Sequence, residues 1–155
     1  MSATTGTTTT RGDTGTGPPL TGFHHFSITV TDVEASAAWY EQVLGLQRLP
    51  VRFPHHGSEE HGYGVLLLEP ALGFGIGLHH NDANPGGAAD ERRTGLDHFA
   101  VAVPARSDLD AWAAHFDRLG VAHAGVTDTD DPIPYSVLVF RDPDNVQLEL
   151  IHLPG

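Results

Sequence analysis

Two histidines and one glutamate are the residues of this chain with the clearest capacity for chemistry. His25 and His98 lie 73 residues apart and begin the similar stretches HFSITV and HFAVAV, while Glu149 lies in a third alternating stretch, QLEL. Two imidazoles and a carboxylate can bind one divalent metal on one side and leave its other positions open for substrate. These three residues therefore predict a metal site and a small metalloenzyme.

Strand alternation predicts where these side chains point, because successive side chains leave opposite faces of a sheet. The apolar positions alternate with the candidate ligands: Phe26, Ile28 and Val30 follow His25, then Phe99, Val101 and Val103 follow His98, and Val146, Leu148 and Leu150 surround Glu149. The candidate ligands therefore share the opposite, less apolar face. If that face is concave, all three are expected to meet in one cavity.

The elements that must position these residues occur twice. The first half predicts a strand at 23–31, a helix at 33–44 ended by Gly45, and strands at 46–53, 62–69 and 74–80. The second half predicts a strand at 96–103, a helix at 107–119 ended by Gly120, and strands at 121–124, 135–141 and 146–152. The same offset of 73 residues relates Trp39 to Trp112 in the two helices. The order β-α-β-β-β in each half indicates a duplicated module.

The remaining segments set the boundaries of one domain. Residues 1–19 consist mainly of Ser, Thr, Gly, Ala and Pro, a composition that predicts a disordered tail. Residues 81–94 contain Pro85-Gly86-Gly87 and predict a linker between the halves. A single domain is thus expected at 20–155, with module one at about 22–80 and module two at about 95–153.

Composition excludes several classes of function. The 155 residues include 8 Lys and Arg against 20 Asp and Glu, and this net charge of -12 would repel nucleic acid and anionic membrane surfaces. There is no cysteine, so disulfides and thiolate metal sites are excluded. The start lacks the basic and apolar pattern of a signal peptide, and apolar runs such as residues 65–68 are far too short to span a bilayer. We expect a cytoplasmic protein that acts on a small molecule.

Four motifs in order resemble the vicinal oxygen chelate superfamily. They are HFSITVTD from His25, WY with LGL from Trp39, GLDHFAV around His98, and RDPDN followed by LEL around Glu149. The superfamily includes glyoxalase I, extradiol dioxygenases, methylmalonyl-CoA epimerase, and the fosfomycin and bleomycin resistance proteins. The resemblance implies an α+β fold in which two β-α-β-β-β modules form curved mixed sheets and an incomplete barrel around a metal. Its usual ligand positions match His25, His98 and Glu149.

The resemblance is incomplete at a fourth ligand position. Many members have Glu, Gln or His at the end of the last strand of module one, where alignment of the two halves places Gly77. Three ligands are the arrangement of extradiol dioxygenases and of non-haem Fe(II) more generally, so Fe(II) is the favoured metal, with Zn, Ni, Mn or Co as alternatives. Extradiol enzymes also carry a tyrosine ten residues before the glutamate, and this position is Val139 here.

Other residues are candidate helpers rather than ligands. His79 has the same strand parity as Gly77, so it is a candidate general base or replacement ligand, and Tyr63 and Tyr135 are further catalytic candidates. The dense group of His and Glu between His55 and His61 is interpreted as a solvated hairpin. Its alternative role is an adventitious metal site.

The resemblance leaves three functions open. The favoured one is a non-haem Fe(II) oxygenase for a small substrate with two adjacent oxygens. A glyoxalase-like lyase or epimerase with another divalent metal is the second, and a metal-free drug-binding protein of the bleomycin resistance kind is the third. Superfamily members often pair or exchange modules between chains, so we expect a homodimer.

Overall fold

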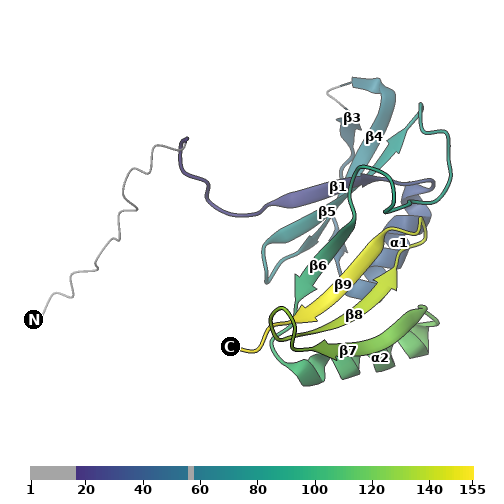
Figure 1. Ribbon diagram of the computed structural model, residues 1–155. Helices are drawn as coiled ribbons and strands as arrows, with labels where there is room; N and C mark the ends of the chain where they lie inside the picture. The colour runs from purple at the N-terminus through teal and green to yellow at the C-terminus, as the bar shows by residue number, and fades with distance from the viewer. Residues whose placement is uncertain (1–16, 56–57) are drawn as a thin grey trace, which may run out of the picture.

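Each half of the chain forms one mixed sheet and one helix (Figure 1). The computed structural model describes residues 17–55 and 58–155. Module one contains β1 (His25–Thr29), α1 (Val33–Leu44), β2 (Gln47–Arg48), β3 (Phe53–His55), β4 (Ser58–Glu69) and β5 (Phe74–Asn81). Module two contains β6 (His98–Ala102), α2 (Arg106–Leu119), β7 (His123–Thr129), β8 (Tyr135–Arg141) and β9 (Gln147–His152).

The two sheets have the same core topology. In the first, here called sheet A, the order is β1-β5-β4-β2, and β3 also pairs with β4. In the second, sheet B, the order is β6-β9-β8-β7. In both sheets the first strand of the module runs parallel to the last one, and the other pairs are antiparallel. The sheets curve without closing into a barrel. The α+β fold with two modules of similar topology is therefore as predicted.

The helices end where capping chemistry requires. Asp32 caps α1, because its Oδ1 accepts hydrogen bonds from the backbone N–H groups of Glu34 and Ala35, each at 3.0 Å. Gly45 and Gly120 follow the two helices in the left-handed conformation, with φ of 69° and 70°, which only glycine adopts without strain. The predicted bounds of α1 agree with the structure, and α2 begins one residue earlier than predicted.

Two strand predictions were wrong. The strand predicted at 46–53 is two short strands, β2 and β3, separated by the segment that contains Pro50, which has no N–H to donate to a ladder. The strand predicted at 121–124 is instead β7, which extends to Thr129. As the edge strand of sheet B it carries exposed Thr127 and Asp128, so the apolar pattern ends before the strand does.

One apolar core joins the two modules. Tyr40 of α1, Phe116 of α2, Ile76 of sheet A and Leu138 of sheet B are all 0% exposed and belong to the same cluster. The α2 helix runs along one face of sheet B (Figure 1). Trp39 of α1 stacks on Phe140 of β8 with the ring centroids 6.3 Å apart, so α1 contacts sheet B as well as its own sheet. Two helices on the apolar faces leave the other faces of both sheets for a site.

The turn at residues 142–145 fastens module two to α1. Tyr40 donates a hydrogen bond of 2.9 Å from its hydroxyl to Asp142, and both side chains are buried. Asp144 accepts from the backbone N–H of Thr31 at 3.1 Å and from the hydroxyl of Ser36. Both side chains are shielded from water, and this burial raises the pKa of Asp142 and of Tyr40. The two modules are thus held by polar as well as apolar contacts.

No helix within residues 17–55 and 58–155 has the length and apolar character needed to cross a membrane.

Candidate metal centre

The predicted ligands lie on the face of each sheet that is turned away from the helices. In β1, His25 is exposed, Ile28 is buried, and exposure alternates along the strand. In β6 and β9 the same alternation leaves His98 exposed and Glu149 partly exposed, between the buried Leu148 and Leu150. We call these two surfaces the ligand faces of sheets A and B. Strand alternation in the sequence directly determines which residues belong to each ligand face.

Two of the three predicted ligands lie together on sheet B. β6 and β9 are parallel neighbours in which His98 pairs with Gln147 and Ala100 pairs with Glu149. His98 Nε2 lies 3.7 Å from Glu149 Oε2. Two atoms that bind one metal at about 2.1 Å each are separated by roughly 3 to 3.5 Å. The pair is therefore close to the spacing that a shared metal requires, and a nitrogen with a carboxylate oxygen is a suitable donor set.

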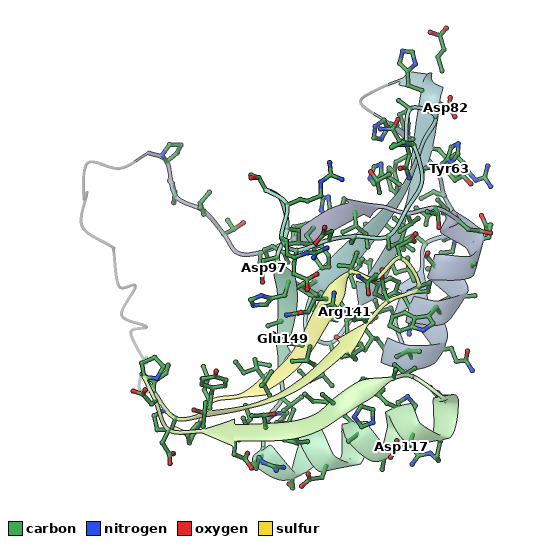
Figure 2. The ribbon with its side chains drawn as sticks, turned by 45° about the vertical axis from the view of Figure 1, so that its right-hand side comes forward. Tyr63, Asp82, Asp97, Asp117, Arg141 and Glu149 are labelled. Atoms are coloured by element: carbon green, nitrogen blue, oxygen red, sulfur yellow. The ribbon has the colours of Figure 1, made fainter. Side chains whose placement is uncertain are left out.

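A hydrogen bond on its other ring nitrogen orients His98. Its Nδ1 lies 2.7 Å from Oδ1 of Asp97, so in a neutral ring the hydrogen is on Nδ1 and Nε2 is the nitrogen presented to Glu149. The pKa of His98 is raised, first by the hydrogen bond to Asp97 and then by the charge of Glu149. Figure 2 shows Asp97 and Glu149 on the same side of sheet B. A carboxylate behind a ligand histidine is a common second layer of metal sites.

A chain of polar contacts orients Glu149 in the same way. Arg141 Nη2 donates to Gln147 Oε1 at 2.9 Å, and Gln147 Nε2 donates to Glu149 Oε1 at 3.3 Å. Glu91 of the linker forms a salt bridge of 2.9 Å with Arg141. Since Oε1 is held by Gln147, Oε2 is the oxygen that faces His98. The sequence analysis did not predict Arg141 or Glu91 as part of the site. Arg141 could have been found, because it shares its strand parity with Val139 and therefore lies on the ligand face.

His25 lies on the other sheet, apart from this pair. It begins β1, and its Nδ1 lies 2.7 Å from Nδ1 of His24. Among residues 17–55 and 58–155, one chain contains no group of three or more His, Asp or Glu side chains that could hold a metal. The structure thus brings His98 and Glu149 together and leaves His25 outside their group.

The register of the strands identifies the fourth position. Glu149 pairs with Ala100, two residues after His98, and Gly77 pairs with Ser27, two residues after His25. Gly77 therefore occupies in sheet A the position of Glu149 in sheet B. A Cβ at Gly77 would collide with the hydroxyl oxygen of Ser27 and lie 3.6 Å from His79 Nε2. This position has no side chain to bind a metal.

The predicted tyrosine helpers are not beside the ligand pair. Tyr63 pairs with His80 on the helix-side face of sheet A, where Arg52 covers its ring at 4.1 Å. Figure 2 shows Tyr63 in the β4–β5 arm, away from Glu149. Tyr135 shares the ligand face of sheet B with Val139, which pairs with Glu149, but lies four residues along β8, about 13 Å away.

His79 lies in a polar group on the ligand face of sheet A. Its Nδ1 is 3.1 Å from Nδ1 of His55, and His55 Nε2 is 3.2 Å from the amide nitrogen of Asn81. His55 is only 7% exposed, so its interpretation as part of a solvated hairpin was wrong. The pairing of β3 with β4 shifts register between Pro54 and His55. His56 lies outside the described residues.

A cavity separates the linker from the first strand. It has a volume of about 440 Å³, within the range of small-molecule sites. The lining includes Ser27 and Thr29 from β1, Arg93 and Asp97 from the linker region, and Gln147 from β9. The linker residues thus form one wall of a cavity that reaches both modules.

Comparison with known proteins shows the family and agrees with the fold. Residues 22–150 match the sequence profile of the Glyoxalase/Bleomycin resistance protein/Dioxygenase superfamily. A solved glyoxylase/bleomycin resistance protein/dioxygenase domain from Frankia sp. EAN1pec is 29% identical, with a TM-score of 0.74 over 88% of this chain and 100% of that one. The chain matches no functionally curated protein.

More distant structures share the fold alone. A lactoylglutathione lyase from Agrobacterium tumefaciens is 18% identical, with a TM-score of 0.62 over 87% of this chain and 96% of that one. A fosfomycin resistance protein from Listeria monocytogenes is 15% identical, with a TM-score of 0.60 over 88% of this chain and 96% of that one.

Proposed function

Because the chain belongs to the glyoxalase/bleomycin resistance protein/dioxygenase superfamily, we propose that it is a non-haem Fe(II) oxygenase of small substrates with two adjacent oxygens. The observation that carries the proposal is the glycine at position 77. The strand register makes Gly77 the counterpart of Glu149, so this position adds no fourth ligand to His25, His98 and Glu149. Two histidines and one carboxylate leave adjacent metal positions open, as non-haem Fe(II) oxygenases require.

The ligand residues have defined roles in this proposal. His98 offers Nε2 because Asp97 holds Nδ1, and Glu149 offers Oε2 because Gln147 holds Oε1. A divalent metal at this position would act as a Lewis acid for the two substrate oxygens. The protein would then orient the substrate and limit its contact with water in the cavity beneath the linker. Val139, which pairs with Glu149, offers no proton, so proton transfer is assigned elsewhere, with His79 as the candidate.

We further propose that two copies of the chain complete each site. His25 of one copy would join His98 and Glu149 of the other. Two observations support this assembly: the ligand pair on sheet B lies near the geometry of a shared metal, and His25 belongs to no metal-binding group among the described residues of one chain. A two-fold dimer would build two such sites from the same surfaces.

The test is the metal content of protein purified without added metal, measured by elemental mass spectrometry. We expect about one equivalent of iron per chain in the wild type, loss of the metal in Glu149→Ala, and retention in Glu41→Ala, a matched change at an exposed glutamate of α1. Zinc, nickel or manganese in place of iron would favour a lyase or epimerase. No metal, even after reconstitution with Fe(II), would overturn the enzyme proposal and leave a binding protein of this fold.

A further inference from the structure

Arg93 carries the one uncommitted positive charge among the arginines of residues 17–55 and 58–155. Its guanidinium makes no hydrogen bond or ion pair with another side chain of that part of the protein. The pKa of Asp90 is lowered first by hydrogen bonds from Arg92 and only last by the charge of Arg93. All the others have partners: carboxylates hold Arg48, Arg52, Arg92, Arg106 and Arg141, and the ring of His115 contacts Arg118.

A turn in the linker separates Arg93 from its neighbours. The backbone N–H of Arg93 donates a hydrogen bond of 3.0 Å to the carbonyl oxygen of Asp90, which closes a turn over residues 90–93. Arg92 folds back onto Asp90, with Nε and Nη2 at 2.8 and 3.1 Å from its two carboxylate oxygens. Glu91 pairs with Arg141 at 2.9 Å. The two carboxylates nearest to Arg93 in sequence are thus already occupied by other arginines.

The backbone that presents Arg93 is fastened to module two. The N–H of Ala89 donates to the carbonyl oxygen of Asp144 at 2.7 Å, and the side-chain amide of Asn145 donates to the carbonyl oxygen of Ala89 at 2.8 Å. The salt bridge of Glu91 adds a third attachment. Arg93 is therefore presented by a segment with a defined position rather than by a free loop.

Arg93 lines the cavity beneath the linker, whereas Arg92 lies outside that lining. Asp97 and Gln147 also line this cavity, and they are the residues that orient the ligand pair on sheet B. The space thus extends from an uncommitted guanidinium to the side chains next to the proposed metal. The lining also contains the apolar residues Phe26, Leu96 and Val146.

We propose that Arg93 determines substrate specificity by binding a carboxylate of the substrate. The substrate class would be a small, partly apolar molecule with two adjacent oxygens for the metal and a carboxylate at its other end. The planar fork of a guanidinium can donate two parallel hydrogen bonds to the two oxygens of a carboxylate. The role of the two adjacent oxygens rests on the proposed function, whereas the contact with Arg93 requires no metal.

The charges around the cavity favour a carboxylate over a phosphate. Asp90, Glu91 and Asp97 line the same space as Arg93. The first two are neutralised by arginines, and Asp97 is held by His98. One uncommitted cation therefore balances one negative charge, and a dianion would leave its second charge among carboxylates.

The test compares two probes that differ in one charge. Protocatechuate is an aromatic ring with two adjacent hydroxyls and a carboxylate, and its amide is neutral and of similar size. Each is titrated calorimetrically without oxygen into the full-length protein loaded with Fe(II). We expect the wild type to bind the acid about fivefold or more tightly than the amide, with the preference falling as sodium chloride is raised.

Arg93→Gln is the informative variant, because glutamine keeps hydrogen-bonding atoms and removes the charge. We expect it to bind the acid and the amide within about twofold of each other, with the amide affinity of the wild type. Unchanged amide affinity also shows that the variant is folded. Arg118→Gln, at an exposed arginine of α2, makes the same change in net charge and should keep the wild-type preference.

The proposal is overturned if the wild type does not prefer the acid, if neither probe binds, or if Arg93→Gln keeps the preference. Equal loss of the preference in Arg118→Gln would also overturn it, since net charge would then be the cause. Elemental analysis reports the metal separately. Bound metal without a preference for the acid refutes this inference alone, and a preference that depends on Arg93 in protein without metal refutes only the proposed metal site.

Discussion

Glu149 owes its orientation to the side chains behind it. In the order Glu91, Arg141, Gln147, Glu149, two donor side chains lie between two carboxylates, and each of the two middle members has a partner on either side. The same carboxylate without Gln147 would be able to turn both oxygens away from His98. At the scale of single residues, the metal site therefore includes the side chains that orient its ligands.

Replacing Gln147 by Leu tests this dependence. Leucine keeps a similar volume and removes the donor to Glu149 Oε1, so we expect metal affinity to fall about 10- to 100-fold with the fold retained. Competition with a coloured chelator measures the affinity. Gln47→Leu, at an exposed glutamine of β2 in module one, is the control and should bind metal as the wild type does. Equal metal affinities in the wild type and both variants would show that Gln147 does not support metal binding.

Asp142 is a single residue with a predictable response to pH. Burial raises its pKa in the folded protein, so the native state keeps the proton where the unfolded chain, with a pKa near 4, has lost it. The contribution of Asp142 to stability is therefore greatest below about pH 4 and falls as pH rises through the folded pKa.

An asparagine side chain cannot ionise, so Asp142→Asn should gain stability relative to the wild type as pH rises from about 4 to 7. The amide oxygen of the variant can still accept from the N–H groups of Asp144 and Val146. Urea unfolding at several pH values measures the difference, with Asp130→Asn as the same charge change at an exposed position. Parallel pH profiles of the wild type and Asp142→Asn would contradict the assignment.

At the scale of elements, α1 is the piece that holds two modules together. Its Tyr40 reaches the turn before β9, and its Trp39 stacks on β8 of sheet B. The helix contributes to the core of its own sheet through the buried Val33, Ala37 and Val43. A change in α1 should therefore affect both modules in one transition.

Tyr40→Phe removes only the hydroxyl and leaves Asp142 without that donor. We expect a loss of about 1 to 3 kcal/mol in the free energy of unfolding, because a buried acceptor loses its partner. Chemical denaturation measures it, and Tyr135→Phe, at a half-buried tyrosine of β8, is the control with a smaller expected effect. A loss below about 0.5 kcal/mol in Tyr40→Phe would show that the contact is dispensable.

At the scale of the whole molecule, the proposed dimer makes a prediction that a single-chain site does not. His25→Ala and His98→Ala should each bind no metal alone. When the two are co-expressed with different tags, half of the dimers are mixed, and each mixed dimer contains one complete site. Metal content should recover to about one quarter of the wild-type value. No recovery in purified mixed dimers would place all three ligands in one chain.

Much of this molecule was determined by the sequence. The faces of His25, His98 and Glu149 follow from strict alternation with apolar neighbours, and a one-residue error would have reversed them. The bounds of α1 follow from Asp32 and Gly45, which are local capping signals. The superfamily itself was recognisable from four short motifs in order. All of these depend on residues close in sequence.

Only the tertiary structure decided which side chains meet. Strand register makes Gly77 the counterpart of Glu149 and confirms the alignment of the halves, while the pairing of β3 with β4 and of β4 with β5 brings His55 to His79. The separation of His25 from the His98 and Glu149 pair depends on how two sheets pack, which no local pattern encodes. Alternation fixes the direction of a side chain within its strand, whereas the distance between strands is set by hydrogen-bond register and by packing across the whole core.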